Sequence, residues 1–279
     1  MSTPAPQKNS GRSSLTLIVS ASVLALILVG TLTIWLTHRD SDTASTPNPS
    51  PGTSAPAAGE PAPTGFAAPD ADPFGRRVDI PNNRYGQPLT QTRGPLAVGD
   101  SNWLTAAPLL PAQGGWQRVF GVSVPFSASD GPTALVDNIP VGYSHTPQGA
   151  ALAAMYATWQ SYARPGDWPL RERMQVMTEA DRTRFDQLKA EGKIPDLAPA
   201  TATKWLLAPD AFRIESWSPT GDLCVLQIAT KKETDTKGAP QWLAGRLVMV
   251  WDGTWRLHLP EDGSIPKTAI NSLSGWTTW

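Results

Sequence analysis

The 279-residue chain is poor in the residues that build metal centres and disulfides. It contains one cysteine and three histidines, and its formal net charge is −1. A single cysteine excludes an intramolecular disulfide, and His38, His145 and His258 lie too far apart in the sequence for a short metal-binding motif. The near-neutral charge creates no overall field that would attract nucleic acid. We therefore expect no metal, no other cofactor and no direct nucleic-acid binding.

The sequence also lacks a recognisable catalytic motif. Ser144 and His145 are adjacent, which directs their side chains apart rather than into a nucleophile–base pair. Tyr156 and Glu215 could supply the donor and the carboxylate of a small-molecule isomerase or dehydratase, but Glu215 on a strand is more typical of a solvated residue. Cys224 alternates with apolar neighbours, which favours a buried position. We assign no catalytic, cofactor-binding or metal-binding residue and do not expect an enzyme.

One long apolar segment stands out. Residues 15–37 contain no charged side chain, and as a helix they would span about 34 Å, enough to cross a hydrocarbon core of about 30 Å. A buried core helix is rarely apolar on all sides over this length. A cleaved signal peptide would have a shorter apolar region, of about 7–15 residues, followed by a small-residue cleavage site. The segment therefore predicts an uncleaved, single transmembrane helix.

The flanking residues predict the orientation of this helix. Lys8 and Arg12 precede it without an acidic neighbour, whereas Arg39 follows it with Asp40 and Asp42 close behind. The positive-inside rule then makes residues 1–14 a cytoplasmic tail and places the rest of the chain outside the cell membrane. Residues 38–73 are rich in proline, alanine, serine and threonine, a composition that cannot repay the entropy of folding. We expect a disordered stalk there.

Residues 74–279 are predicted to form one extracytoplasmic domain. Its first part, residues 74–142, reads as an extended lead-in rich in proline and glycine, with one short strand over Trp116–Pro125. Residues 143–259 carry the main helical and strand patterns. Residues 260–279 form a tail on which Trp276 and Trp279 could dock into a partner or into their own domain.

Two helices have clear start signals. Thr146 can cap a helix with Pro147 at its first position, and the uncharged run 148–163 predicts that this helix is central and mostly buried. A second helix is expected to begin at Thr178, with Asp181 as its capping-box acid, and to end near Glu191. A shorter helical piece is expected around residues 204–207.

The rest of the core reads as an antiparallel meander. The predicted strands are Phe212–Ser218, Leu223–Lys232, Gln241–Trp251 and Thr254–Leu259. Asp252-Gly253 is a two-residue hairpin signal that pairs Trp251 with Thr254. This register would place Val248 and Val250 on the core face, together with Trp255 and Leu257. Helices followed by such a meander predict an α+β fold.

Two resemblances extend these expectations. The helix order and the final Trp-Asp-Gly-Thr-Trp-Arg-Leu hairpin resemble the nuclear transport factor 2-like fold, a cone of helices and a curved antiparallel sheet. Asp130-Gly131-Pro132 and the run 142–151, with Thr146-Pro147, resemble a "GP … G(F/Y)xxTPxGA" pattern of uncharacterised actinobacterial membrane proteins of integrative or conjugative elements. Together they are similar to the single-pass assembly factors of type IV secretion systems.

These resemblances imply a non-enzymatic scaffold or assembly protein. It would bind other envelope proteins of a conjugative transfer or secretion apparatus and could form homo-oligomers. An envelope ligand-binding module and a small-molecule enzyme remain the alternatives. A deep pocket with convergent polar groups would favour either alternative, whereas a filled interior would favour the scaffold.

The predicted topology can be tested with a protease added outside intact protoplasts. Because residues 38–73 are predicted to be unfolded and outside the membrane, cleavage there should release a folded fragment that ends at Trp279. Immunoblotting of the supernatant would detect this fragment. Protection in intact protoplasts, with cleavage only after lysis, would contradict the orientation.

Overall fold

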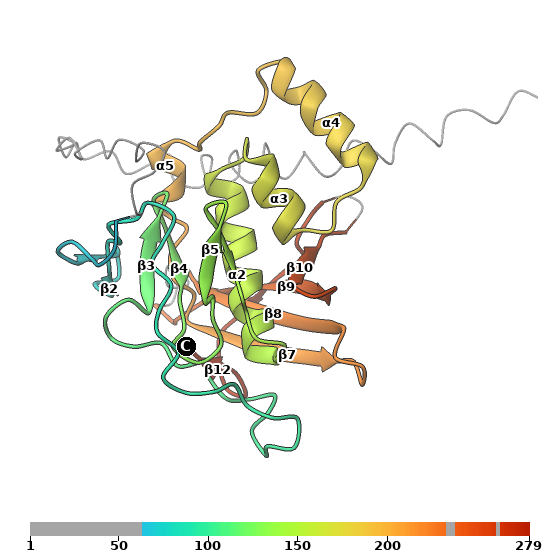
Figure 1. Cartoon of the computed structure of the whole chain (residues 1–279). Helices are drawn as coiled ribbons and strands as arrows, with labels where there is room; N and C mark the ends of the chain where they lie inside the picture. The colour runs from blue at the N-terminus through green and yellow to red at the C-terminus, as the bar shows by residue number, and fades with distance from the viewer. Residues whose placement is uncertain (1–62, 233–237, 261–262) are drawn as a thin grey trace, which may run out of the picture.

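The computed structural model describes residues 63–232, 238–260 and 263–279 (Figure 1). The predicted cytoplasmic tail, the transmembrane helix 15–37 and most of the predicted stalk lie outside these residues. Within the described part of the chain, no helix is long and apolar enough to span a membrane.

Helix α2 (Pro147–Ala163) is the centre of the fold. Thr146 caps it by accepting a hydrogen bond from the backbone N–H of Gly149 at 3.0 Å, and Pro147 occupies its first turn. The helix is buried on nearly all sides because its residues are uncharged and many are alanines, which let neighbouring elements approach closely. The predicted start, length and burial of this helix are confirmed.

Strands cover this helix on two sides. On one side lies a six-stranded antiparallel sheet in the order β10-β9-β8-β7-β12, with β11 also paired to β9. On the other side, the β3–β4 hairpin contacts α2. The strands of the six-stranded sheet are β7 (Ala211–Trp217), β8 (Leu223–Lys231), β9 (Trp242–Trp251), β10 (Trp255–His258), β11 (Lys267–Ile270) and β12 (Thr277–Thr278). The strands of the small sheets are β1 (Asp70–Ala71), β2 (Arg77–Val78), β3 (Trp116–Val119), β4 (Val122–Pro125), β5 (Ala134–Val136) and β6 (Ile139–Val141).

The expected α+β cone similar to nuclear transport factor 2 is wrong. The described residues are dominated by β-structure, with few helices. Residues 74–142, predicted to be mostly irregular, contain β2 to β6. The β3–β4 hairpin places β-structure on the second side of α2, so the helix lies between strands on both sides instead of lining a cone.

The remaining helices form a smaller, second hydrophobic cluster. Its members are Trp168, Phe185, Leu188 and Ile194, with Met177 packed against them. They are carried by α3 (Trp168–Met174), α4 (Glu179–Ala190) and the segment after α4. The capping box of Thr178 and Asp181 at the start of α4 is confirmed.

Two helical predictions need correction. Helix α3 was not predicted, although Asp167 at its N-cap and a proline in its first turn are recognisable start signals. The short helix expected around residues 204–207 instead is α5 (Ala200–Thr203), which follows Pro199. Both helices are short, so neither shows an apolar period that could fix its limits.

Part of the predicted stalk is ordered. Within residues 63–73, the backbone N–H of Ala67 donates to the carbonyl of Ile80 at 2.9 Å, and β1 pairs with β2. Arg118 forms an ion pair with Asp70 at 2.5 Å. Composition predicted disorder, but these long-range contacts make residues from 63 onward part of the folded domain.

The β9–β10 hairpin differs from its prediction by one residue. Trp251 pairs with Trp255 rather than with Thr254. Only Gly253 of the loop has a positive φ, +91°, so residues 252–254 form a three-residue loop and not a type I′ turn. A shift of one residue turns every side chain of a strand to the other face. Leu247 and Met249 therefore face α2.

Val248 and Val250, which were predicted to face the core, lie on the opposite face of the sheet and are half-buried. Trp255 and Leu257 are buried as predicted.

The C-terminal tail docks onto its own domain. After β11, the chain crosses the sheet to pair β12 with the far strand β7. Trp276 lies 4.9 Å from the guanidinium of Arg213, and Trp279 packs on Phe212 at 4.6 Å between ring centres. Of the two predicted docking sites for these tryptophans, a partner or their own domain, the structure shows the second.

The β3–β4 hairpin replaces the single strand predicted over Trp116–Pro125 and turns at an unusual residue. Phe120 has a φ of +51°, a left-handed conformation that costs a non-glycine residue about 1–2 kcal/mol. Contacts of its ring offset this strain, because the guanidinium groups of Arg84 and Arg164 each lie 4.6 Å from the ring centre. Tyr85 adds an edge-to-face contact at 5.3 Å.

These contacts predict the effect of Phe120→Asn. Asparagine tolerates the left-handed conformation, but it removes two cation–π contacts and one aromatic pair. Because each is worth about 0.5–1.5 kcal/mol, the loss should exceed the relieved strain, and the melting temperature should fall by several degrees. Asp137→Asn, at an exposed position with the same φ, is the control and should change little. Equal melting curves for both variants would contradict this account.

Candidate functional site

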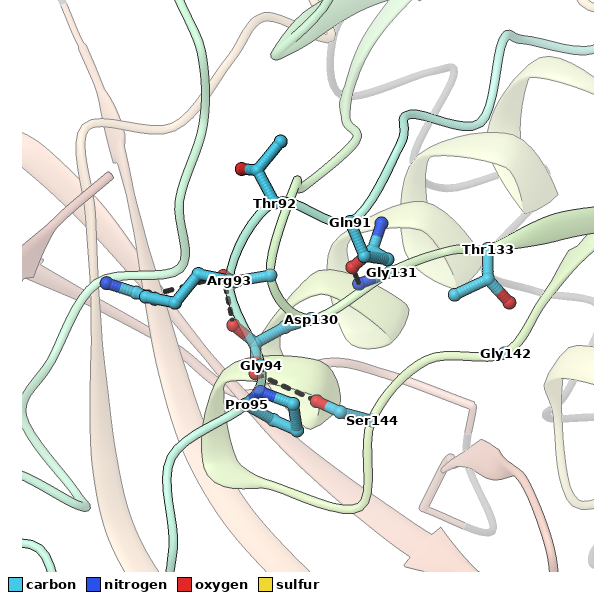
Figure 2. Close-up of a pocket in the computed structure, with 11 residues that line it drawn as sticks. Gln91, Thr92, Arg93, Gly94, Pro95, Asp130, Gly131, Thr133, Gly142 and Ser144 are labelled. Carbon is cyan, nitrogen blue, oxygen red and sulfur yellow. Dashed lines mark hydrogen bonds between the residues drawn. The ribbon is translucent and has the colours of Figure 1, made fainter.

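A depression of about 450 Å³ lies beside the start of helix α2 (Figure 2). One wall is the segment 91–95, and the other is built from the β4–β5 connection, Gly142 and Ser144. The lining residues are Gln91, Thr92, Arg93, Gly94, Pro95, Ser129, Asp130, Gly131, Thr133, Gly142 and Ser144. They are mostly small, and most of the surface that they expose to the depression is apolar.

Asp130 anchors the wall of the depression. Only 2% of this residue is exposed. Its Oδ1 accepts hydrogen bonds from Ser144 at 2.8 Å and Thr146 at 3.0 Å, and its Oδ2 accepts one from Ser129 at 2.5 Å. Hydrogen bonds to a carboxylate are short and strong, and such bonds offset the cost of burying a carboxylate. Asp130 thus joins the β4–β5 connection to the N-cap of α2.

The rim extends this network. The Arg93 guanidinium donates to the Oγ of Ser129 at 3.3 Å, and Ser127 and Ser129 exchange a hydrogen bond at 3.1 Å. Gln91 accepts from the backbone N–H of Gly131 at 3.2 Å and donates to the carbonyl of Ser127 at 2.9 Å. The two walls are therefore tied together by hydrogen bonds.

Three glycines allow the walls to meet. A Cβ at Gly131 would lie 2.4 Å from the carbonyl oxygen of Gly142, and one at Gly142 would lie 1.9 Å from the Oγ1 of Thr133. A Cβ at Gly149 would lie 2.1 Å from the carbonyl oxygen of Ser144. The glycines of the motif segments Asp130-Gly131-Pro132 and 142–151 are therefore explained by close packing at this helix start.

His145 points away from the serine beside it. Its ring stacks on Trp251 at 4.2 Å between ring centres, and its Nε2 is 2.7 Å from the carbonyl oxygen of Gly221. The Oγ of Ser144 is bonded instead to Asp130 and Thr146. The side chains of Ser144 and His145 therefore point apart, as predicted. His145 joins the start of α2 to the sheet through Trp251 and Gly221.

Tyr156 and Glu215, the pair considered for an enzyme, are not brought together. The Tyr156 hydroxyl is buried and accepts a hydrogen bond from Arg164 at 3.3 Å, and burial raises its pKa to about 12, although Arg164 opposes the shift. Glu215 is exposed and forms an ion pair with Arg246 at 2.7 Å. The pair cannot act as a facing donor and base.

Cys224 lies on β8 and is fully buried. Burial raises the pKa of its thiol to about 12, so it stays protonated at neutral pH. Within the described residues, no group of three histidine, cysteine, aspartate or glutamate side chains could hold a metal ion.

The sequence did not reveal Asp130 as the centre of this site. Asp130 was read only as part of the Asp130-Gly131-Pro132 segment, and its partners Ser144 and Thr146 lie on a different segment. A signal was available, because an aspartate preceded closely by Ser127 and Ser129 is a local hydrogen-bonding pattern. The contacts of this segment with Arg93 and Gln91 could not be predicted, because these residues lie more than 30 positions away in the sequence.

The effect of Asp130→Asn measures the strength of this network. The amide has the same shape but no charge, and it replaces one acceptor oxygen by a donor. Because hydrogen bonds to charged groups contribute about 1.5–3 kcal/mol, we expect a loss of about 2–3 kcal/mol in unfolding free energy, measured by chemical denaturation. Asp222→Asn is a matched control, since Asp222 also accepts from two hydroxyls, of Ser218 and Thr220, but is exposed. A smaller loss for Asp130 than for Asp222 would contradict the role given to burial.

Comparison with known proteins places this domain in a family. The family model described as "Domain of unknown function (DUF8175)" matches residues 79–278. No curated protein matches the chain, and no solved structure matches it. The matched residues cover more than half of the chain and include the depression, α2 and all six strands of the large sheet. The chain therefore belongs to the family defined by this domain of unknown function, DUF8175.

Proposed function

We propose that the chain is a membrane-anchored, non-enzymatic scaffold whose extracytoplasmic domain binds other envelope proteins. Its setting would be a conjugative transfer or secretion apparatus. The observation that carries this proposal is the Asp130 network, which gives the depression a fixed shape with its carboxylate already bonded to three hydroxyl groups.

The chemistry of the depression favours a protein partner. A carboxylate whose oxygens are bonded to three hydroxyls is poorly placed to take a proton from a substrate. The lining contains glycine, proline and threonine next to the guanidinium of Arg93. The side chains are small and most of the exposed lining is apolar, so an extended polypeptide could approach closely and bury apolar surface. Arg93, which is exposed on the rim, would select for an acidic or carbonyl-rich segment.

The packing of the interior supports the same proposal. Buried apolar side chains from the β3–β4 hairpin, α2 and the sheet form one cluster around the helix. Aromatic and aliphatic groups thus fill the space in which a small-molecule enzyme would need a cavity. The setting in a transfer apparatus is favoured by the predicted anchor and stalk and by the similarity of the 130–132 and 142–151 segments to actinobacterial membrane proteins.

Photocrosslinking in living cells tests this proposal. A photoreactive amino acid replacing Thr92, which is exposed on the rim, should give discrete adducts whose masses identify envelope proteins. The same amino acid at Ala190, exposed at the end of α4, is the control and should give far fewer. The adducts should decrease in an Arg93→Ala background while the chain stays at its normal level.

Two results would contradict the proposal. One is equal adduct patterns at Thr92 and Ala190, which would mean that the depression is not a contact site. The other is conversion of a small molecule by the purified chain, with activity lost in Ser144→Ala. The latter would make the domain an enzyme.

A further inference from the structure

The two guanidinium groups that lie against the ring of Phe120 differ in what else they bind. Arg164 is 2% exposed. Its guanidinium donates to three side chains at 3.0–3.3 Å, those of Gln160, Asp167 and Tyr156. Arg84 is exposed, and within the described residues it has no hydrogen-bond or ion-pair partner, only its contacts with two aromatic rings. The five N–H donors of Arg84 are therefore available to a ligand.

Tyr85 adds a second unused polar group. Its ring meets Phe120 edge-on at 5.3 Å, and the guanidinium of Arg84 lies 5.6 Å from its ring centre. Its hydroxyl has no hydrogen-bond partner in the part of the chain that the structure describes, and it is not enclosed by the protein. We call Arg84, Tyr85 and Phe120 the arginine–aromatic patch.

The backbone under the arginine–aromatic patch is held by hydrogen bonds. The N–H of Tyr85 donates to the Oδ1 of Asn83 at 3.0 Å, and the N–H of Gly86 donates to the carbonyl of Asn83 at 2.9 Å. The next residue, Gln87, donates through its N–H to the Oε1 of Gln117 at 2.7 Å. A side chain that starts from a fixed backbone and packs on aromatic rings loses little freedom when it binds. The unused donors of Arg84 and Tyr85 are thus preorganised.

The hairpin turn does not itself require a phenylalanine at position 120. Phe120 and Gly121 form a two-residue loop between the paired residues Val119 and Val122, with φ values of +51° and +81°. Such a type I′ turn favours Asn-Gly, and strained residues of this kind are frequent at functional sites. An asparagine would suit the turn, but it would leave Arg84 without the ring on which it packs.

We propose that the arginine–aromatic patch binds an acidic segment of another protein, with Arg84 donating to a carboxylate of that segment. A guanidinium matches a carboxylate through two parallel hydrogen bonds, and the hydroxyl of Tyr85 can donate another. Residues 80–99 and the hairpin 116–125 contain no acidic residue, so these segments do not compete for Arg84. Arginine and tyrosine are also the residue types that most often dominate the energy of protein interfaces.

The composition of the patch favours a protein over other anions. A membrane surface attracts clusters of several basic residues, whereas this patch offers one unpaired guanidinium, because Arg164 is buried and bonded to Asp167. A free phosphate would leave the rings of Tyr85 and Phe120, which are half-buried, in contact with water. A polypeptide can place a carboxylate on Arg84 and an apolar group on these rings.

The arginine–aromatic patch and the depression lie at opposite ends of α2. Thr146, the N-cap of this helix, bonds to Asp130 in the wall of the depression. Arg164, the C-cap, contacts Phe120. The 17 residues between the caps span about 25 Å, so both surfaces can be occupied at once. This inference therefore goes beyond the proposed function and does not need the depression.

Photocrosslinking of the full chain in living cells tests the inference. p-Azidophenylalanine in place of Tyr85 keeps the ring and puts the reactive group where the hydroxyl was. Light should join the chain to another protein, and mass spectrometry should locate the adduct within a few residues of an aspartate or glutamate. Adding Arg84→Gln should lower the adduct yield at least about tenfold, which corresponds to about 1.4 kcal/mol.

Arg182 provides a matched control. Its guanidinium also lies over an aromatic ring, that of Trp168, at 4.9 Å, and it is exposed, but it is already paired with Asp186 at 3.0 Å. Arg182→Gln should therefore leave the adduct yield unchanged. Arg84→Lys keeps the charge but loses the two parallel hydrogen bonds, so it should lower the yield severalfold. Because Arg84 is exposed, the melting temperatures of its variants should stay close to that of the native chain.

The outcomes also separate this inference from the proposed function. The inference is overturned by an adduct yield that Arg84→Gln does not change, by adducts far from any acidic residue, by adducts with lipid alone, or by no adduct. Adducts at Thr92 without adducts at position 85 would overturn it and leave the proposed function intact. Adducts at position 85 that depend on Arg84, without adducts at Thr92, would support it and count against the role of the depression.

Discussion

The whole domain depends on burying a helix that has no polar face. Helix α2 is uncharged from Pro147 to Ala163 and is covered on nearly all sides. An amphipathic helix needs one apolar partner surface, whereas this one needs partners all round. The sheet provides one of them through Leu226, Leu247 and Met249, and the β3–β4 hairpin provides another. The segment before α2 therefore had to fold into hairpins, whatever its content of proline and glycine.

Buried charges at the two ends of α2 match its dipole. The carboxylate of Asp130 bonds to the N-cap residue Thr146, and anionic groups are stabilised at a helix N-terminus. At the other end, Arg171 donates to the carbonyls of Ser161 and Pro165 at 3.1 and 3.3 Å. Burial lowers the pKa of Arg171 to about 10, so it remains charged at neutral pH. The carbonyl of Ser161 is among those left unpaired at a helix end, and Arg171 satisfies it.

Local signals predicted what local interactions determine. Thr146 with Pro147, and Thr178 with Asp181, located two helix starts because each cap bonds within three residues. The alternation of side chains along the sequence predicted the strands β7 to β10. The hairpin loop at Gly253 was misread by one residue, since the dipeptide signal is shared by loops of different length. That single residue exchanged Val248 and Val250 with Leu247 and Met249 between the two faces of the sheet.

What the sequence could not supply were contacts between distant segments. Arg93 meets Ser129, and Trp255 donates to the carbonyl of Ser144 at 2.8 Å, across gaps that no short motif spans. The fold class failed for the same reason, because β2 to β6 are short and are held by their neighbours. The outward surfaces of the domain come from such long-range packing. The depression exists because Asp130 holds the start of α2, and Val248 and Val250 face outward because Leu247 and Met249 cover that helix.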